Sequence, residues 1–155
     1  MNSPAVNRYD EWMGLALAEA ALTHGTGDVP VGAVVVDDAG TVLGAGRNRR
    51  ELDGDPTAHA EVVAIRAAAA ALGSWRLDDT TLIVTLEPCT MCAGAILQSR
   101  IPRVVFGAWD EKAGAAGSAY DLLRDRRLPH RVEVVAGIRA LESTTMLTEF
   151  FGERR

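Results

Sequence analysis

Short apolar runs alternate with segments of helical spacing along most of this chain. Thr81–Leu86 is a nearly continuous apolar run that Pro88 ends, and such a run is typical of a strand buried on both faces. The segments on either side of it, about His59–Leu72 and Thr90–Gln98, have the spacing of helices, and Gly73 is well placed to end the first. A buried strand between two helices predicts a sheet with helices packed on its faces.

The remaining elements extend this pattern to the whole chain. In chain order they are a helix at about Tyr9–His24, strands at Val31–Val36, Thr41–Gly46, Arg103–Phe106 and Arg131–Val135, and a last helix at about Ile138–Phe151. Asp37–Gly40 is typical of a hairpin turn between the first two strands, and Asn48–Pro56 is a polar loop. This order predicts an α/β fold, a three-layer α-β-α sandwich with a mixed central sheet of about five strands, in a single domain over residues 1–155.

Composition excludes several classes of protein. Of the 155 residues, 48% are hydrophobic and 24% are charged, which is typical neither of a disordered chain nor of a membrane protein. No apolar run is long enough to span a bilayer. The first residues lack the pattern of a secretory signal, so we expect a cytoplasmic protein. The net charge of -5 argues against non-specific coating of nucleic acid, although a small docking surface is compatible with it.

The two cysteines of the chain, Cys89 and Cys92, are separated by two residues. Cysteines this close together cannot join distant parts of a fold, so a disulfide framework is excluded. The pair is therefore either half of a metal site or a redox pair.

A second motif favours the metal. His59-Ala60-Glu61 lies at the start of one predicted helix, and Cys89 and Cys92 lie at the start of the next. Side chains at two neighbouring helix N-termini can converge on one point, and the positive ends of both helix dipoles favour thiolates. One imidazole and two thiolates would leave tetrahedral zinc with one open position, which is typical of a catalytic zinc.

Glu61 supplies the group that such a zinc needs. Zinc lowers the pKa of a bound water, and a carboxylate two residues from a ligand can take its proton and deliver protons to a ring nitrogen and a departing amine. The spacing H-x-E…P-C-x-x-C is the signature of zinc-dependent nucleobase deaminases.

Each motif alone has a simpler interpretation. The cysteines could be a redox pair, and His59 could be a capping or core residue. A structural zinc would normally need a fourth protein ligand, and neither of the other histidines, His24 and His130, is suitably placed. The joint occurrence of both motifs at predicted helix starts favours one catalytic zinc.

Sequence segments around these motifs resemble those of a known family, and the similarity extends over about Trp12–Phe151. The chain resembles the bacterial tRNA-specific adenosine deaminases of the cytidine deaminase-like superfamily. The similar segments are residues 29–34 (VPVGAV), 55–61 (DPTAHAE), 85–95 (TLEPCTMCAGA), 99–101 (SRI), 104–108 (VVFGA) and 114–118 (GAAGS).

This resemblance implies a homodimer with one zinc ion per subunit that converts adenosine to inosine at the wobble position of a tRNA anticodon loop, with an arginine tRNA as the expected substrate. His59, Cys89 and Cys92 would be the ligands and Glu61 the proton shuttle. The resemblance also implies substrate contacts from four residues, namely Asn48, Ala60, Asp110 and Phe151. Asn48 would hold the flipped base, although a turn asparagine is an alternative. Asp110 would accept from the ribose 2′-hydroxyl, although a solvated loop aspartate is also compatible.

Two other functions remain open. A deaminase of a free base or nucleotide, such as guanine or cytosine, would share the zinc residues and differ at the rim of the pocket. A zinc-stabilised RNA-binding module without activity is disfavoured because a structural site has no use for Glu61 beside an open position.

Overall fold

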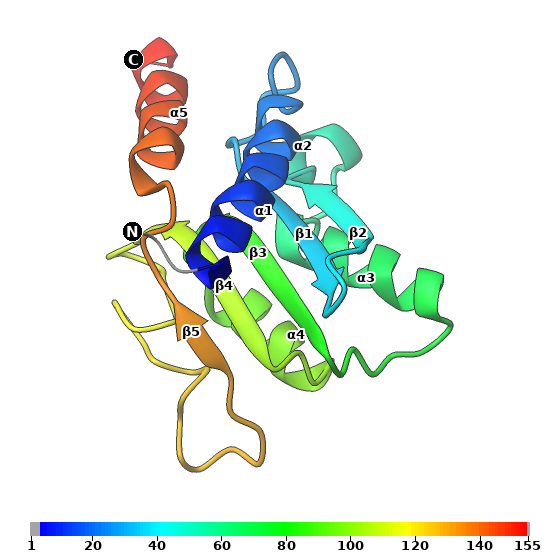
Figure 1. Ribbon diagram of the computed structural model, residues 1–155. Coiled ribbons are helices and arrows are strands. Elements are labelled where there is room, and N and C mark those ends of the chain that lie inside the picture. The colour runs from blue at the N-terminus through cyan, green and yellow to red at the C-terminus, as the bar shows by residue number, and fades with distance from the viewer. Residues whose placement is uncertain (1–3, 155) are drawn as a thin grey trace.

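A five-stranded sheet forms the centre of the molecule (Figure 1), whose computed structural model describes residues 4–154, with side chains from residue 7. The strands are β1 (Gly32–Asp37), β2 (Val42–Arg47), β3 (Thr80–Leu86), β4 (Arg103–Ala108) and β5 (Glu133–Val135). Their order in the sheet is β2-β1-β3-β4-β5. Strand β1 pairs antiparallel with β2 and β3, whereas β3, β4 and β5 run parallel. The predicted mixed sheet of about five strands is confirmed.

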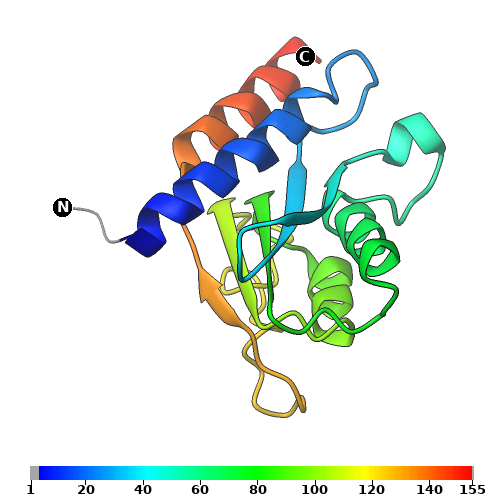
Figure 2. The same cartoon turned by 45° about the vertical axis from the view of Figure 1, so that its right-hand side comes forward.

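Helices cover both faces of this sheet. They are α1 (Pro4–Ala21), α3 (Ala60–Leu72), α4 (Thr90–Gln98) and α5 (Ala140–Glu153), whereas the short α2 (Arg50–Asp53) does not pack on the sheet. On one face lie α3 and α4, and on the other α1 and α5 lie side by side (Figure 2). The predicted α-β-α sandwich is therefore confirmed. None of the helices within residues 4–154 combines the length and apolarity that a membrane crossing requires.

Strand β1 is apolar from Ala33 to Val36 because both of its faces are covered. Val35 belongs to the buried cluster that packs against α3, and Val34 and Val36 belong to the cluster that packs against α1. Successive side chains of a strand point to opposite faces, so a strand covered on both sides needs apolar residues throughout. The same holds for β3, which is buried from Thr80 to Thr85.

Three predicted elements differ from those observed. The first helix, expected at about Tyr9–His24, spans Pro4–Ala21. The expected strand Arg131–Val135 is reduced to Glu133–Val135, because the Val132 N–H donates to the Leu123 carbonyl outside the sheet. The expected polar loop Asn48–Pro56 contains the short helix α2.

Glycines bring α3 close to β2 and thereby set the position of this helix. A Cβ atom built on Gly46 would lie 2.6 Å from the Ala60 carbonyl oxygen, and one on Gly44 would lie 2.5 Å from the Ala64 carbonyl oxygen. Ordinary contacts are 3.4–4 Å, so only glycine lets the helix backbone approach this closely. The alanine-rich face of α3 completes the close packing.

Candidate active site

The starts of α3 and α4 bring the predicted metal ligands together. His59 and Cys89 are the N-cap residues of the two helices, and both have extended backbone conformations, with φ -72° and -77°. Neither side chain caps its own helix, so both are free to point elsewhere. Cys92 lies in the first turn of α4 and is buried.

Distances between the three side chains fit a zinc ion. The Nδ1 atom of His59 lies 3.6 Å from Sγ of Cys89 and 3.4 Å from Sγ of Cys92. Tetrahedral zinc with Zn–N and Zn–S bonds of about 2.1 and 2.3 Å separates nitrogen from sulfur by about 3.6 Å. This is the one group of three or more His, Cys, Asp or Glu side chains within the described residues that is close enough to hold a metal. His59, Cys89 and Cys92 would hold zinc and leave its fourth position open.

Proton sharing between the sulfurs prepares them for a cation. A hydrogen bond from the Cys92 thiol lowers the pKa of Cys89 to about 3, and the same contact raises the pKa of Cys92. The hydrogen bond with Cys89 raises the pKa of His59. The lowered pKa of Cys89 favours its thiolate, and a bound zinc would favour the thiolate of Cys92 as well.

Glu61 lies in the first turn of α3, with only 4% of its surface exposed. Burial raises the pKa of its carboxyl group to about 7. A carboxyl group of that pKa can both accept and donate a proton near neutral pH, which suits a proton shuttle.

A pocket of about 180 Å³ lies over these groups. Its walls include His59, Glu61 and Cys89 together with three of the residues expected to contact substrate, namely Asn48, Ala60 and Asp110. Further lining residues that the sequence did not single out are Val29, Val31, Arg50, Leu86, Glu87 and Ala113. The fourth expected contact, Phe151, lies on α5 outside this pocket and is 51% exposed.

Asn48 is tied to the backbone around the pocket. Its side-chain N–H₂ donates to the Val29 carbonyl at 3.1 Å, and its side-chain oxygen accepts from the Arg50 N–H at 3.2 Å. An amide has a second N–H and a second lone pair, so Asn48 can still bond a ligand in the pocket. These bonds hold its side chain in one orientation at the wall.

Asp28 is a positioning residue that the sequence did not reveal. Its buried carboxylate accepts from the N–H groups of Glu51 and Leu52, at 2.6 and 3.2 Å, and from the Thr26 hydroxyl at 2.8 Å. It thereby caps α2 from more than 20 residues away and holds the wall that contains Asn48. No local signal marks this role, because the partners are distant in sequence.

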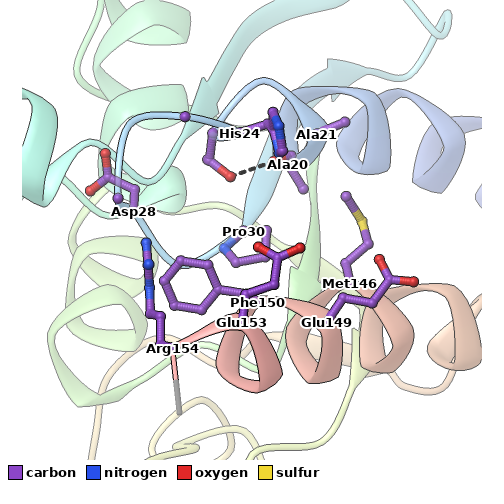
Figure 3. A pocket seen from close by; sticks show the side chains of 13 residues that line it. Ala20, Ala21, His24, Asp28, Pro30, Met146, Glu149, Phe150, Glu153 and Arg154 are labelled. Carbon is purple, nitrogen blue, oxygen red and sulfur yellow. Dashed lines mark hydrogen bonds between the residues drawn. The ribbon is translucent and has the colours of Figure 1, made fainter.

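A larger cavity of about 760 Å³ lies between the end of α1 and α5 (Figure 3). It contains Asp28, Pro30 and Phe150, with the Arg154 guanidinium 4.0 Å from the Phe150 ring centre. Val29 and Val31 line the smaller pocket instead, so alternate residues of this extended segment face the two cavities. The metal-binding group and Glu61 lie at the smaller pocket, and we therefore assign the chemistry to it despite its size.

Comparison with known proteins agrees with this site. Residues 6–108 match the family model described as the cytidine and deoxycytidylate deaminase zinc-binding region. Fold, ligand set and this match together define a zinc-binding deaminase, and zinc as the expected metal is confirmed.

Individual relatives indicate to which group of deaminases the chain belongs. The tRNA-specific adenosine deaminase of Haemophilus influenzae is 49% identical over 96% of this chain and 87% of its own length. That of Bacillus subtilis is 46% identical over 93% of this chain and 89% of its own. A solved structure from a study of A-to-I editing by tRNA:A34 deaminases superposes with a TM-score of 0.84 at 44% identity, covering 88% of this chain and 99% of the other. The chain belongs to the family of tRNA-specific adenosine deaminases.

Proposed function

We propose that this chain catalyses hydrolytic deamination of adenosine to inosine at the wobble position of a tRNA, with an arginine tRNA as substrate. The observation that carries the proposal is a metal-binding group, His59, Cys89 and Cys92, at a pocket that Glu61 also lines, in a chain 49% identical to a tRNA-specific adenosine deaminase. The reaction consumes one water and releases ammonia.

Glu61 performs the proton transfers in this proposal. Zinc, when held by the three ligands, supplies a water of lowered pKa as the nucleophile. The Glu61 carboxylate would accept one proton from that water and deliver it to the adenine ring nitrogen. Once the water oxygen is bonded to the ring carbon, Glu61 would accept the second proton from that oxygen and deliver it to the amine, which leaves as ammonia. Its burial keeps bulk water away and its pKa near 7 suits both directions of transfer.

Three residues around the ligands would hold the nucleoside. Asn48 presents an amide whose orientation is fixed by Val29 and Arg50, and it would hydrogen-bond the flipped base. The backbone of Ala60, at the N-terminus of α3, offers a donor at the positive end of the helix dipole. Asp110 lies at the rim, where its carboxylate would accept from the ribose 2′-hydroxyl and favour RNA.

The larger cavity offers a path for the nucleotides beside the target base. When the base enters the smaller pocket, its neighbours in the anticodon loop would cross residues 28–31 toward α5. Phe150 and Phe151 lie edge to face on that helix, with ring centres 5.1 Å apart, and Phe151 is exposed. Phe150 lines the larger cavity, whereas Phe151 lies beside it and outside that lining. An exposed ring can stack on an unpaired base, and we propose this role for Phe151.

We further propose that the chain forms a homodimer and acts in the cytoplasm. The dimer is what the family resemblance implies, and a tRNA substrate is compatible with the cytoplasm. Sedimentation velocity of the purified protein would give a mass near twice the 16.5 kDa of one chain, and a species of 16.5 kDa would contradict the dimer.

The central test is an anticodon stem-loop carrying a wobble adenosine, with inosine detected by mass spectrometry. We expect inosine from this substrate, and we expect Glu61→Gln to lose activity while it retains one zinc per chain. Free guanine and free cytosine are assayed as alternative substrates under the same conditions. Deamination of either free base without inosine formation would refute the tRNA proposal in favour of a small-molecule deaminase.

A further inference from the structure

Glu87 is a buried carboxylate directly before the Pro-Cys of the metal site, with 2% of its surface exposed. Three backbone N–H groups donate to it, from Asp110 at 2.9 Å, Ala116 at 3.0 Å and Ser118 at 3.1 Å, and the Ser118 hydroxyl lies 2.5 Å away. A buried charge is costly unless hydrogen bonds compensate for lost water. All the compensating donors come from one loop, residues 110–118.

Contacts on both sides of Glu87 join this loop to a metal ligand. The Ala115 N–H donates to the Pro88 carbonyl at 2.7 Å, and Cys89 and Gly114 form a β-bridge. A Cβ atom at Gly114 would overlap the Glu87 carboxylate, so the loop can approach it only with glycine there. The loop and the start of α4 thus form one connected unit.

Asp110 gains its position from this unit. Its N–H donates to Glu87, and its carbonyl accepts from the Gly114 N–H at 2.8 Å. That carbonyl also lies 2.6 Å from the Ser118 hydroxyl, whose single proton can be donated either to it or to Glu87 at one time. The backbone of Asp110 is therefore fixed on both sides. Its carboxylate at the rim of the pocket is held within the same loop, because Oδ1 accepts from the N–H groups of Lys112 and Ala113 at 3.1 and 3.2 Å.

We infer that Glu87 is a positioning residue for substrate recognition, acting through Asp110 and the loop that contains it. The inference rests on the proposed function, because it concerns how the same site distinguishes a ribose from a deoxyribose. Loss of the anchor lets Asp110 move from the position at which it accepts from the 2′-hydroxyl. The chemical step, which uses Glu61, is affected less than substrate binding and ribose discrimination.

Ser118→Ala is the mildest test, since it removes one hydroxyl and leaves the Ser118 N–H bond to Glu87. Ser143→Ala is its control: the Ser143 hydroxyl is buried, whereas that of Ser118 is partly buried, and it too donates one short hydrogen bond to a carbonyl, that of Thr85 at 2.6 Å, where α5 packs on β3. Glu87→Gln is the stronger variant, because its N–H₂ replaces an acceptor facing the N–H donors of the loop.

Each variant is assayed for zinc content, kcat and KM on stem-loops with adenosine or 2′-deoxyadenosine at the wobble position. We expect Ser118→Ala to keep its zinc, to raise KM about tenfold for the ribose substrate and to lower the ribose-to-deoxyribose ratio of kcat/KM similarly, as for loss of one hydrogen bond to a charged group. Glu87→Gln should raise KM and lower the ribose-to-deoxyribose ratio by more than Ser118→Ala does. Ser143→Ala should have the KM and the ratio of the wild type.

An unchanged ratio in Ser118→Ala and Glu87→Gln would overturn the inference, as would an equal fall in Ser143→Ala. Loss of zinc or kcat alone would make Glu87 a support for the metal site instead. If Glu87→Gln does not fold, the comparison of Ser118→Ala with Ser143→Ala alone tests whether Glu87 positions Asp110. Absence of inosine with the wild-type protein refutes the proposed function itself, and this inference with it.

Discussion

Replacement of Gly46 by alanine tests whether the approach of α3 to β2 sets the position of the catalytic residues. The new Cβ would lie 2.6 Å from the Ala60 carbonyl oxygen, against at least 3.4 Å for an ordinary contact, so the first turn of α3 must move by about 0.8 Å. That turn contains Glu61 and directly follows His59. A misplacement of about 1 Å can lower a rate by about 100-fold, and overpacking costs about 1–3 kcal/mol of stability.

Gly44→Ala provides the matched control. Its Cβ would lie 2.5 Å from the Ala64 carbonyl oxygen and equally close to the Ala68 nitrogen, so the clash is as severe but lies one to two turns farther along α3. We expect both variants to lose similar stability in thermal unfolding. Only Gly46→Ala should lose most of its kcat/KM on the stem-loop, by about 30- to 100-fold, when both are assayed well below their unfolding midpoints.

An equal loss of activity in the two variants would contradict the prediction that the position of the first turn of α3 limits activity. Activity would then follow stability rather than the position of the first turn. Retention of wild-type kcat/KM by Gly46→Ala would likewise show that the site adapts to the shift. Zinc content is measured in each case, because movement of His59 can act through metal affinity.

Two further predictions concern the ligands and the pocket wall. A chelator should remove both zinc and activity. Zinc release should become faster as the pH falls, because protonation of the imidazole and the thiolates competes with the metal. Cys92→Ala should purify without stoichiometric zinc, and full zinc occupancy of this variant by atomic absorption would contradict the ligand assignment. Asp28→Ala should cost about 1–2 kcal/mol through loss of the α2 cap and should speed hydrogen exchange of the Glu51 and Leu52 amides, with Asp28→Asn intermediate. Unchanged exchange at these two amides would show that the cap does not hold α2.

Local patterns account for what the sequence predicted well. The strand β3 and the helices on either side of it were recognisable because apolar continuity and helical spacing depend on neighbours in the chain. Prediction was weaker at the edge strand β5, where Val132 donates to Leu123 instead of extending the ladder. Choices of this kind depend on residues several positions away and leave no periodic signal.

At the metal site, too, the residues marked by local motifs could be predicted, whereas those held by distant partners could not. The sequence alone predicted the zinc ligands and the role of Glu61, because the types and spacings of His59, Cys89 and Cys92 at two expected helix starts restrict the chemistry. The structure brings the three predicted ligands close enough to hold a metal. Only the tertiary structure decided that Glu87 anchors the loop containing Asp110, through partners 23 to 31 residues away. Such bonds form where the fold brings distant segments together and excludes water, so the buried carboxylate and its donors become evident only once the chain is folded.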